Sequence, residues 1–209
     1  MGFLRKVWFI FIKDLQAEFR SKELLSTMLI FALLVVVVFG FAFDPTVNEL
    51  AAVFPGLLWV TFLFAGVLGL NRSFQVEKMN DALQGLMLLP TDRSAIYFGK
   101  VLGNLFFVLV TQLVSLPLFF VFFNQRFTGN LAAFIMVLFL GTLGFVEVGT
   151  FLAALAANTR TSELLLPLLL FPVMIPVVLA AVKLTLTVLA GEAIAGTELL
   201  WLRILVAYD

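Results

Sequence analysis

Residues 24–43 read LLSTMLIFALLVVVVFGFAF, an apolar stretch that contains no charged side chain. A helix rises about 1.5 Å per residue, so this stretch would extend about 30 Å, the thickness of the hydrocarbon core of a bilayer. Four similar stretches follow, at about 50–70, 101–123, 132–157 and 164–190. In lipid, backbone amides must bond within their own segment, which favours helices. The sequence therefore predicts an all-α integral membrane protein, with five spans in one transmembrane domain over 1–209.

The composition supports this class of protein. Hydrophobic residues make up 63% of the chain, charged residues only 12%, and the mean hydropathy is +1.14. A soluble domain of 209 residues does not have this composition.

The residue types also limit the chemistry of the chain. Cysteine and histidine are both absent, so the usual thiolate and imidazole ligands of zinc, haem iron and iron–sulfur clusters are missing. The sequence has no G-x-x-x-x-G-K-[ST] loop for nucleotide and no H-E-x-x-H motif. We therefore expect no catalytic residue, no metal site and no cofactor held by this chain, and we expect no nucleic-acid partner.

Residues 1–23 have the pattern of an amphipathic helix lying in the headgroup plane. Apolar side chains recur at helical spacing: Phe3, Leu4, Val7, Trp8, Phe11, Ile12, Leu15 and Phe19. Charged side chains occupy much of the other side: Arg5, Lys6, Lys13, Asp14, Glu18, Arg20 and Lys22. The alternative is the charged region of a cleavable signal peptide, but the next apolar run lacks a small-x-small cleavage pattern. A retained interfacial helix is the preferred interpretation.

The distribution of Lys and Arg predicts the orientation. Five lie in the N-terminal segment, four in the 71–100 loop and one in the 158–163 loop, whereas the opposite side has only Arg126 and Arg203. This imbalance of ten to two places the N-terminus in the cytoplasm. Residues 191–209 then form a periplasmic segment that is too short and too mixed to cross, and we expect a sixth helix to be missing from this sequence.

The 71–100 loop is the longest polar segment and lies on the predicted cytoplasmic side. Leu83, Leu86 and Met87 follow i, i+3, i+4 spacing, and Pro90 helps to end the pattern. These residues predict a short amphipathic helix whose apolar stripe suits a groove on a soluble partner. A surface helix that merely rests on lipid is the open alternative.

Glu147 lies near the middle of the fourth span, where an acidic side chain costs about 2.5 to 3.5 kcal/mol to insert. Gly144, Thr150 and Ala154 share its helical face, so we expect Glu147 to point into protein. Lys183 is the candidate counter-ion, but it lies about 13 Å away along the membrane normal, and direct pairing is not expected. Glu147 either locks helices together, the preferred interpretation, or acts at a substrate gate.

Three prolines interrupt the fifth span: Pro167, Pro172 and Pro176. Each interior proline removes a backbone hydrogen bond, so we expect a kinked or broken helix. The span is about 40 Å long as a straight helix, which also requires tilt or a break. The irregularity marks either a moving gate or an accommodation to packing.

Four stretches give the chain a family resemblance. They are EFRSKE at 18–23; LMLLP at 86–90 with DRS at 92–94 and GK at 99–100; LGTLGF at 140–145; and the proline-rich fifth span. Together they resemble the haem exporter protein B family, the permeases of the cytochrome c maturation system within the ABC-2 type membrane subunits. The resemblance extends over most of the chain.

Membership of that family implies an ABC-2 type bundle of six helices, a homodimer of permeases and a location in the bacterial cytoplasmic (inner) membrane. It implies a separate ATP-binding protein (component A of the maturation system), membrane components C and D, and a haem chaperone E, with ATP and haem held by those partners. ATP hydrolysis would then drive release of the haem-loaded chaperone. The resemblance assigns ATPase coupling to residues 77–90, with these candidates: Glu77, Asp81, Leu83, Leu86, Met87 and Pro90.

Two other functions stay open at this point. One is an ABC-2 exporter of another cargo, such as a lipid-linked sugar or a drug. The other is a membrane scaffold for haem-handling partners that transports nothing.

Overall fold

The computed structural model describes residues 2–43, 50–79, 92–157, 159 and 162–209. Within these ranges the regular secondary structure is entirely helical, and there is no strand. The helices are α1 (Phe3–Ser21), α2 (Glu23–Ala42), α3 (Leu50–Met79), α5 (Arg93–Phe122), α6 (Leu131–Ala157), α7 (Ser162–Leu189) and α8 (Glu198–Tyr208). The predicted all-α class is confirmed.

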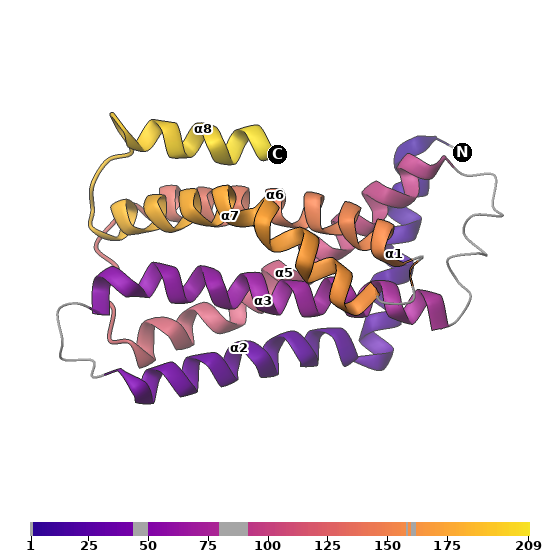
Figure 1. Ribbon diagram of the computed structural model, residues 1–209, viewed down its shortest axis with the longest axis horizontal. Coiled ribbons are helices and arrows are strands. Elements are labelled where there is room, and N and C mark those ends of the chain that lie inside the picture. Colours follow the sequence, from indigo (N-terminus) through magenta and orange to yellow (C-terminus); the bar gives the residue numbers. More distant parts are fainter. Residues whose placement is uncertain (1, 44–49, 80–91, 158, 160–161) are drawn as a thin grey trace.

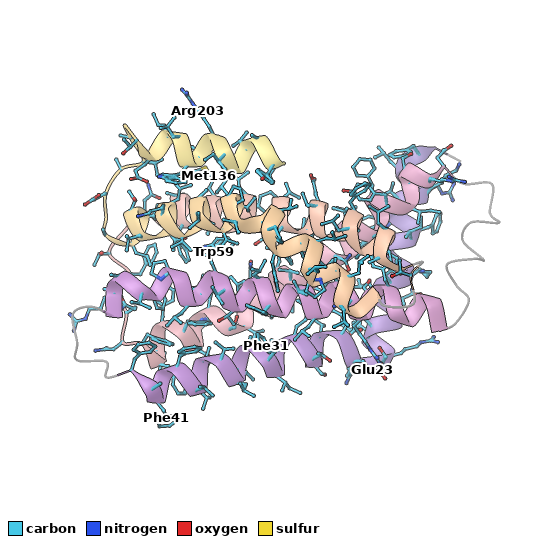
Figure 2. All side chains as sticks on the ribbon, viewed as in Figure 1. Glu23, Phe31, Phe41, Trp59, Met136 and Arg203 are labelled. Atoms are coloured by element: carbon cyan, nitrogen blue, oxygen red, sulfur yellow. The ribbon has the colours of Figure 1, made fainter. Side chains whose placement is uncertain are left out.

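Five of these helices form a bundle along the long axis of the molecule (Figure 1). They are α2, α3, α5, α6 and α7, and each is long and apolar enough to cross a membrane. The helix α1 runs across one end of this bundle, close to the N-terminus (Figure 1). Phe41 extends from the outside of α2 (Figure 2), and Leu34 on the same helix is also exposed, as expected for a surface that faces lipid.

Two of the spans continue well beyond the predicted membrane boundary. Both α3 and α5 contain 30 residues, or about 45 Å of helix, which exceeds the hydrocarbon core of about 30 Å. Residues 71–79 and 93–100 are therefore helical, which corrects the prediction of one loop over 71–100. The hydropathy pattern predicts where a helix leaves the lipid, but the helix itself can continue into water. Charged residues such as Arg72 therefore do not end α3. Residues 80–91, which contain most of the predicted short amphipathic helix, lie outside the described residues.

The segment 191–209 turns back along the bundle. Gly191 and Gly196 have φ values of 77° and 61°, a region that favours glycine, and they allow the turn between α7 and α8. The helix α8 then packs against α7 and α6, and the Tyr208 hydroxyl donates to the Val173 carbonyl at 3.3 Å. With 11 residues, α8 extends only about 16 Å and does not cross the bundle.

Buried hydrogen bonds join neighbouring spans. The Gln112 side chain of α5 donates to Thr142 of α6 at 2.7 Å, and Asn104 donates to Thr150 at 3.0 Å. Trp59 of α3 lies towards α7 (Figure 2), and its indole N–H donates to the Thr185 hydroxyl at 2.9 Å. Such bonds contribute about 0.6 kcal/mol each within a bilayer, and they also fix which faces of the helices meet.

Phenylalanine rings fill the other end of the bundle. Phe54 of α3 meets Phe119 and Phe120 of α5 and Phe123, which follows the last residue of α5, at centroid distances of 6.2, 5.3 and 5.9 Å, all edge to face. Edge-to-face pairs of this kind contribute about 0.5–1.5 kcal/mol beyond their buried area. This aromatic cluster holds α3 and α5 together at the end farthest from α1.

The helix α7 is continuous through its three prolines, Pro167, Pro172 and Pro176. Its N-terminal half is inclined to its C-terminal half (Figure 1). Because proline has no backbone N–H and its ring displaces the preceding turn, a bend is the expected result.

The absence of a side chain at Gly141 allows α6 to approach α3 closely. A Cβ atom at this position would come within 2.4 Å of the buried Trp59 ring, which would have to move and lose its bond to Thr185. We expect Gly141→Ala to lower the unfolding free energy by about 1–3 kcal/mol, the cost of overpacking. Thermal unfolding of the purified protein in detergent measures this change.

Gly56→Ala is the matched control, because no atom lies within 4 Å of its added Cβ. It should leave the unfolding temperature unchanged or raise it slightly, since alanine favours helix over glycine. Equal losses from both substitutions would show that the contact between Gly141 and Trp59 does not limit packing.

Candidate functional site at the charged end of the bundle

The transverse helix α1 packs against the first half of α5. Val7 and Ile10 of α1 are buried in this contact. Gly99 makes the approach possible, because a Cβ atom there would lie 2.7 Å from the Ile10 side chain. The glycine in the GK pair at 99–100 thus has a packing role.

A buried ion pair joins the same two helices. Lys100 Nζ lies 2.9 Å from Asp14 Oδ2, and the two side chains are only 4% and 13% exposed. Lys13 lies 3.0 Å from the other carboxylate oxygen, and Lys100 Nζ lies 5.7 Å above the Phe74 ring of α3. One lysine therefore connects α1, α5 and α3.

Glu18 connects α1 to the start of α2. Its buried carboxylate accepts the Leu25 N–H at 2.8 Å and the Ser21 hydroxyl at 3.4 Å. Leu25 is in the first turn of α2, where backbone N–H groups have no partner within the helix, so Glu18 caps this helix from outside. Lys22 between the two helices has φ 56°, the left-handed conformation that turns the chain.

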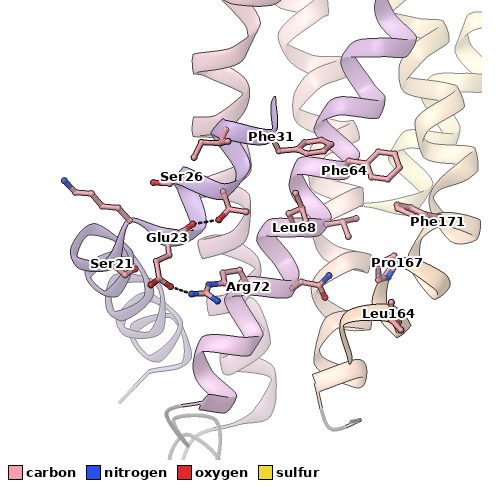
Figure 3. Close-up of a pocket in the computed structure, with 15 residues that line it drawn as sticks. Ser21, Glu23, Ser26, Phe31, Phe64, Leu68, Arg72, Leu164, Pro167 and Phe171 are labelled. Atoms are coloured by element: carbon pink, nitrogen blue, oxygen red, sulfur yellow. Dashed lines mark hydrogen bonds and ion pairs between the residues drawn. The ribbon is translucent and has the colours of Figure 1, made fainter. Parts of the chain in front are cut away.

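Two more ion pairs lie at this end of the molecule. Glu23 of α2 pairs with Arg72 of α3 (Figure 3), and Lys6 of α1 lies 3.5 Å from Asp92 at the start of α5. We call the full set the elbow cluster: Lys6, Asp14, Glu18, Glu23, Arg72, Asp92 and Lys100. It ties α1, α2, α3 and α5 together.

The elbow cluster corrects the predicted placement of the charges of α1. Asp14 and Glu18 were assigned to a face in contact with headgroups, but both are mostly buried against protein. They share a helical face with Val7 and Ile10, and that face contacts α5 and α2. Two features of the sequence indicate this buried face. Asp14 and Glu18 are four residues apart, and Gly99 and Gly103 lie near Lys100 on the helix that they approach.

Of the predicted coupling residues, the structure describes only one. Glu77 falls on the last turns of α3, whereas Asp81, Leu83, Leu86, Met87 and Pro90 lie outside the described residues. The segment that holds them leaves α3 after Met79 and returns at Asp92, a member of the elbow cluster. Of the two helices that bound it, α5 is paired with α1 through Lys100, and α3 is linked to the same lysine through Phe74.

The second predicted site is not assembled in the same way. Glu147 of α6 is half-buried, and its backbone carbonyl accepts the Tyr97 hydroxyl at 3.0 Å. Across the described ranges, no side chain donates a hydrogen bond to its carboxyl, and Lys183 makes no ion pair with it. On the predicted small-residue face, Gly144 and Thr150 are buried and Ala154 is exposed.

Taken together, five apolar spans and a transverse charged helix anchored at one end define a multi-pass integral membrane protein. The sequence profile of the family described as CcmB protein matches residues 5–209. The chain therefore belongs to the CcmB protein family.

Several curated bacterial proteins named Heme exporter protein B are similar to the chain. The Pseudomonas aeruginosa protein is 28% identical over 195 residues, which cover 93% of this chain and 86% of that protein. The Rhodobacter capsulatus protein is 30% identical over 182 residues, or 87% and 83% of the two chains. The Escherichia coli K12 protein is 33% identical over 97 residues, and that alignment spans 46% of this chain and 44% of the relative.

Asp14→Asn tests the buried ion pair. The substitution removes the carboxylate charge closest to the buried Lys100 ammonium, which costs about 3 kcal/mol for pairs of this kind. We expect a lower unfolding temperature in detergent, and we expect limited proteolysis to release α1 earlier.

Asp92→Asn is the matched control, since Asp92 is 67% exposed and its pair with Lys6 is worth less than about 1 kcal/mol. If both variants unfold alike, the pair between Asp14 and Lys100 does not anchor α1.

Proposed function

We propose that this chain is the membrane permease of an ABC transporter complex that exports or handles haem for cytochrome c maturation. Membership of the CcmB protein family supports this proposal, as do the relatives named Heme exporter protein B. The chain supplies the membrane path or platform, and a separate ATP-binding protein supplies the energy.

The orientation follows from the charges. Of the twelve Lys and Arg residues outside the predicted spans, ten fall in the N-terminal segment and in the 71–100 and 158–163 segments, and segments rich in Lys and Arg stay in the cytoplasm. The N-terminus and the elbow cluster then face the cytoplasm of a bacterial inner membrane. A cytoplasmic ATPase would therefore meet the end of the bundle at which α3 and α5 protrude.

One structural observation carries the coupling mechanism: residues 80–91 connect two helices that the elbow cluster holds together. We propose that Leu83, Leu86 and Met87 insert into a groove of the ATP-binding protein. Displacement of this connection would then act on both α3 and α5. Through Lys100 and Asp92 the same displacement would reach α1.

The remaining partners follow from the family. We propose a homodimer of this permease, membrane components C and D, and a chaperone E that leaves with haem. ATP and haem are held by these partners. Glu77, Asp81 and Pro90 belong to the coupling segment, and Glu147 and the prolines of α7 are the candidates for motion within the membrane.

Leu86→Cys tests the coupling surface, and the chain has no other cysteine to interfere. We expect a bifunctional maleimide to link this position to a cysteine on the ATP-binding protein in at least one nucleotide state. Glu192→Cys, exposed at the opposite end of the bundle, is the control and should capture none. If the cysteine at position 86 is not cross-linked to the ATP-binding protein in any nucleotide state, the coupling role is contradicted.

Deletion and complementation test the function itself. We expect deletion of this chain to abolish mature c-type cytochromes. We expect the same result when the ATP-binding protein is catalytically inactive. Covalently bound haem on membrane cytochromes is the measurement. Normal cytochromes after deletion would favour another cargo. Normal cytochromes with an inactive ATPase would favour the scaffold.

A further inference from the structure

A groove opens between α2 and the inclined half of α7, with α3 as its floor (Figure 3). Its volume is about 850 Å³, within the range of pockets that hold small ligands. The groove exists because α2 packs against α3 and α5, whereas α7 packs against α3 and α6. Pro167 and Phe171 line it from α7, on the segment that the prolines displace.

One end of the groove is polar and basic. Lys22, Ser26, Asn71 and Arg72 line it, and Glu23 is the single carboxylate. Two cations against one anion leave an excess of one positive charge. In the part of the chain that the structure describes, the Lys22 ammonium has no ion-pair partner, because Glu23 is paired with Arg72.

The other end is aromatic and apolar. The Phe31 and Phe64 rings lie 6.3 Å apart, and the Phe64 and Phe171 rings lie 5.0 Å apart, so three helices contribute to one row. Ile30 and Leu68 extend this surface and are 64% and 37% exposed. The row offers flat apolar contact to a chain lying along it.

The change from polar to apolar occurs at matching levels on two helices. Glu23 precedes Phe31 by eight residues on α2, and Arg72 follows Phe64 by eight residues on α3. Each separation is about 12 Å along the helix. The groove therefore suits a ligand with an anionic head and a long apolar tail, aligned with the membrane normal.

We propose that this groove binds one anionic phospholipid from the leaflet beside the elbow cluster. Lys22 and the free guanidinium N–H groups of Arg72 would hold the phosphate, and Ser26 and Asn71 would donate to the head. An acyl chain would lie along Phe31, Phe64 and Phe171. This site is additional to the proposed transport function and does not depend on it.

Charge complementarity favours a phospholipid over a second copy of the chain. The outward faces of the spans are apolar, so a neighbouring helix in the groove would offer Lys22 no anion. A lipid already in the bilayer reaches the groove sideways, with its phosphate at the level of the basic end.

To test this, the full chain is reconstituted in nanodiscs that contain equal amounts of phosphatidylglycerol and phosphatidylcholine. The protein is then transferred to detergent, and the lipids that stay bound to it are compared. Native mass spectrometry counts the bound lipids. We expect phosphatidylglycerol to be retained in several-fold excess. Lys22→Asn should abolish the excess while tolerating the left-handed backbone, because asparagine adopts it readily. Arg20→Gln removes the same charge nearby but outside the groove, and should retain the excess.

A second variant tests the apolar end. Leu68→Trp places a larger ring in the groove and should reduce retention of phosphatidylglycerol several-fold, whereas Leu155→Trp on the exposed face of α6 should not. Equal retention of both lipids by the unchanged protein would overturn the proposal. So would equal behaviour of Lys22→Asn and Arg20→Gln, or a disulfide between two copies of Ser26→Cys without retained lipid.

Discussion

The ion pair between Asp14 and Lys100 is the interaction on which the organisation of this protein depends. Two charges removed from water are tolerated only when each compensates the other, so the pair fixes α1 against α5 in one arrangement. The contact of Lys100 with the Phe74 ring adds α3, and Glu18 adds the first turn of α2. A transverse amphipathic helix, which lipid alone would leave free to slide in the headgroup plane, thereby becomes part of the bundle.

Inside the membrane a different balance applies. Lipid gives no hydrophobic reason for helices to associate, so small residues and paired polar side chains decide which faces meet. Gly141 against Trp59, Gln112 with Thr142 and Asn104 with Thr150 perform this role. The close packing of α6 on α3 and its hydrogen bonds to α5 contrast with α2, whose outer face is largely exposed. The open space lies beside α2, where the groove is found.

The same features connect structure with the proposed role. A motor component must transmit force from a cytoplasmic partner, which requires a stiff connection between the contact surface and the spans. The long helices α3 and α5 would provide one, because the buried Lys100 of α5 pairs with Asp14 of α1 and contacts the Phe74 ring of α3. The bend in α7 provides the opposite property, because three missing backbone donors leave that helix less tightly bonded along its length. A rigid end and a bent span then coexist in a single bundle.

Hydropathy alone determined the number and approximate limits of the spans, because the cost of placing charge in hydrocarbon is large and local in sequence. Glu18 and Asp14 could not be placed in this way. A charged residue on a short helix is compatible with headgroups or with a buried partner, and for Asp14 only the approach of Lys100 from a distant part of the sequence decides between them. Hydropathy also did not predict the ends of α3 and α5. It reports which residues can lie in lipid, whereas the end of a helix depends on its backbone hydrogen bonds. Tertiary structure also created the groove: the prolines predict a bend in α7, but only the packing of the helices decides that the bent half lies opposite α2.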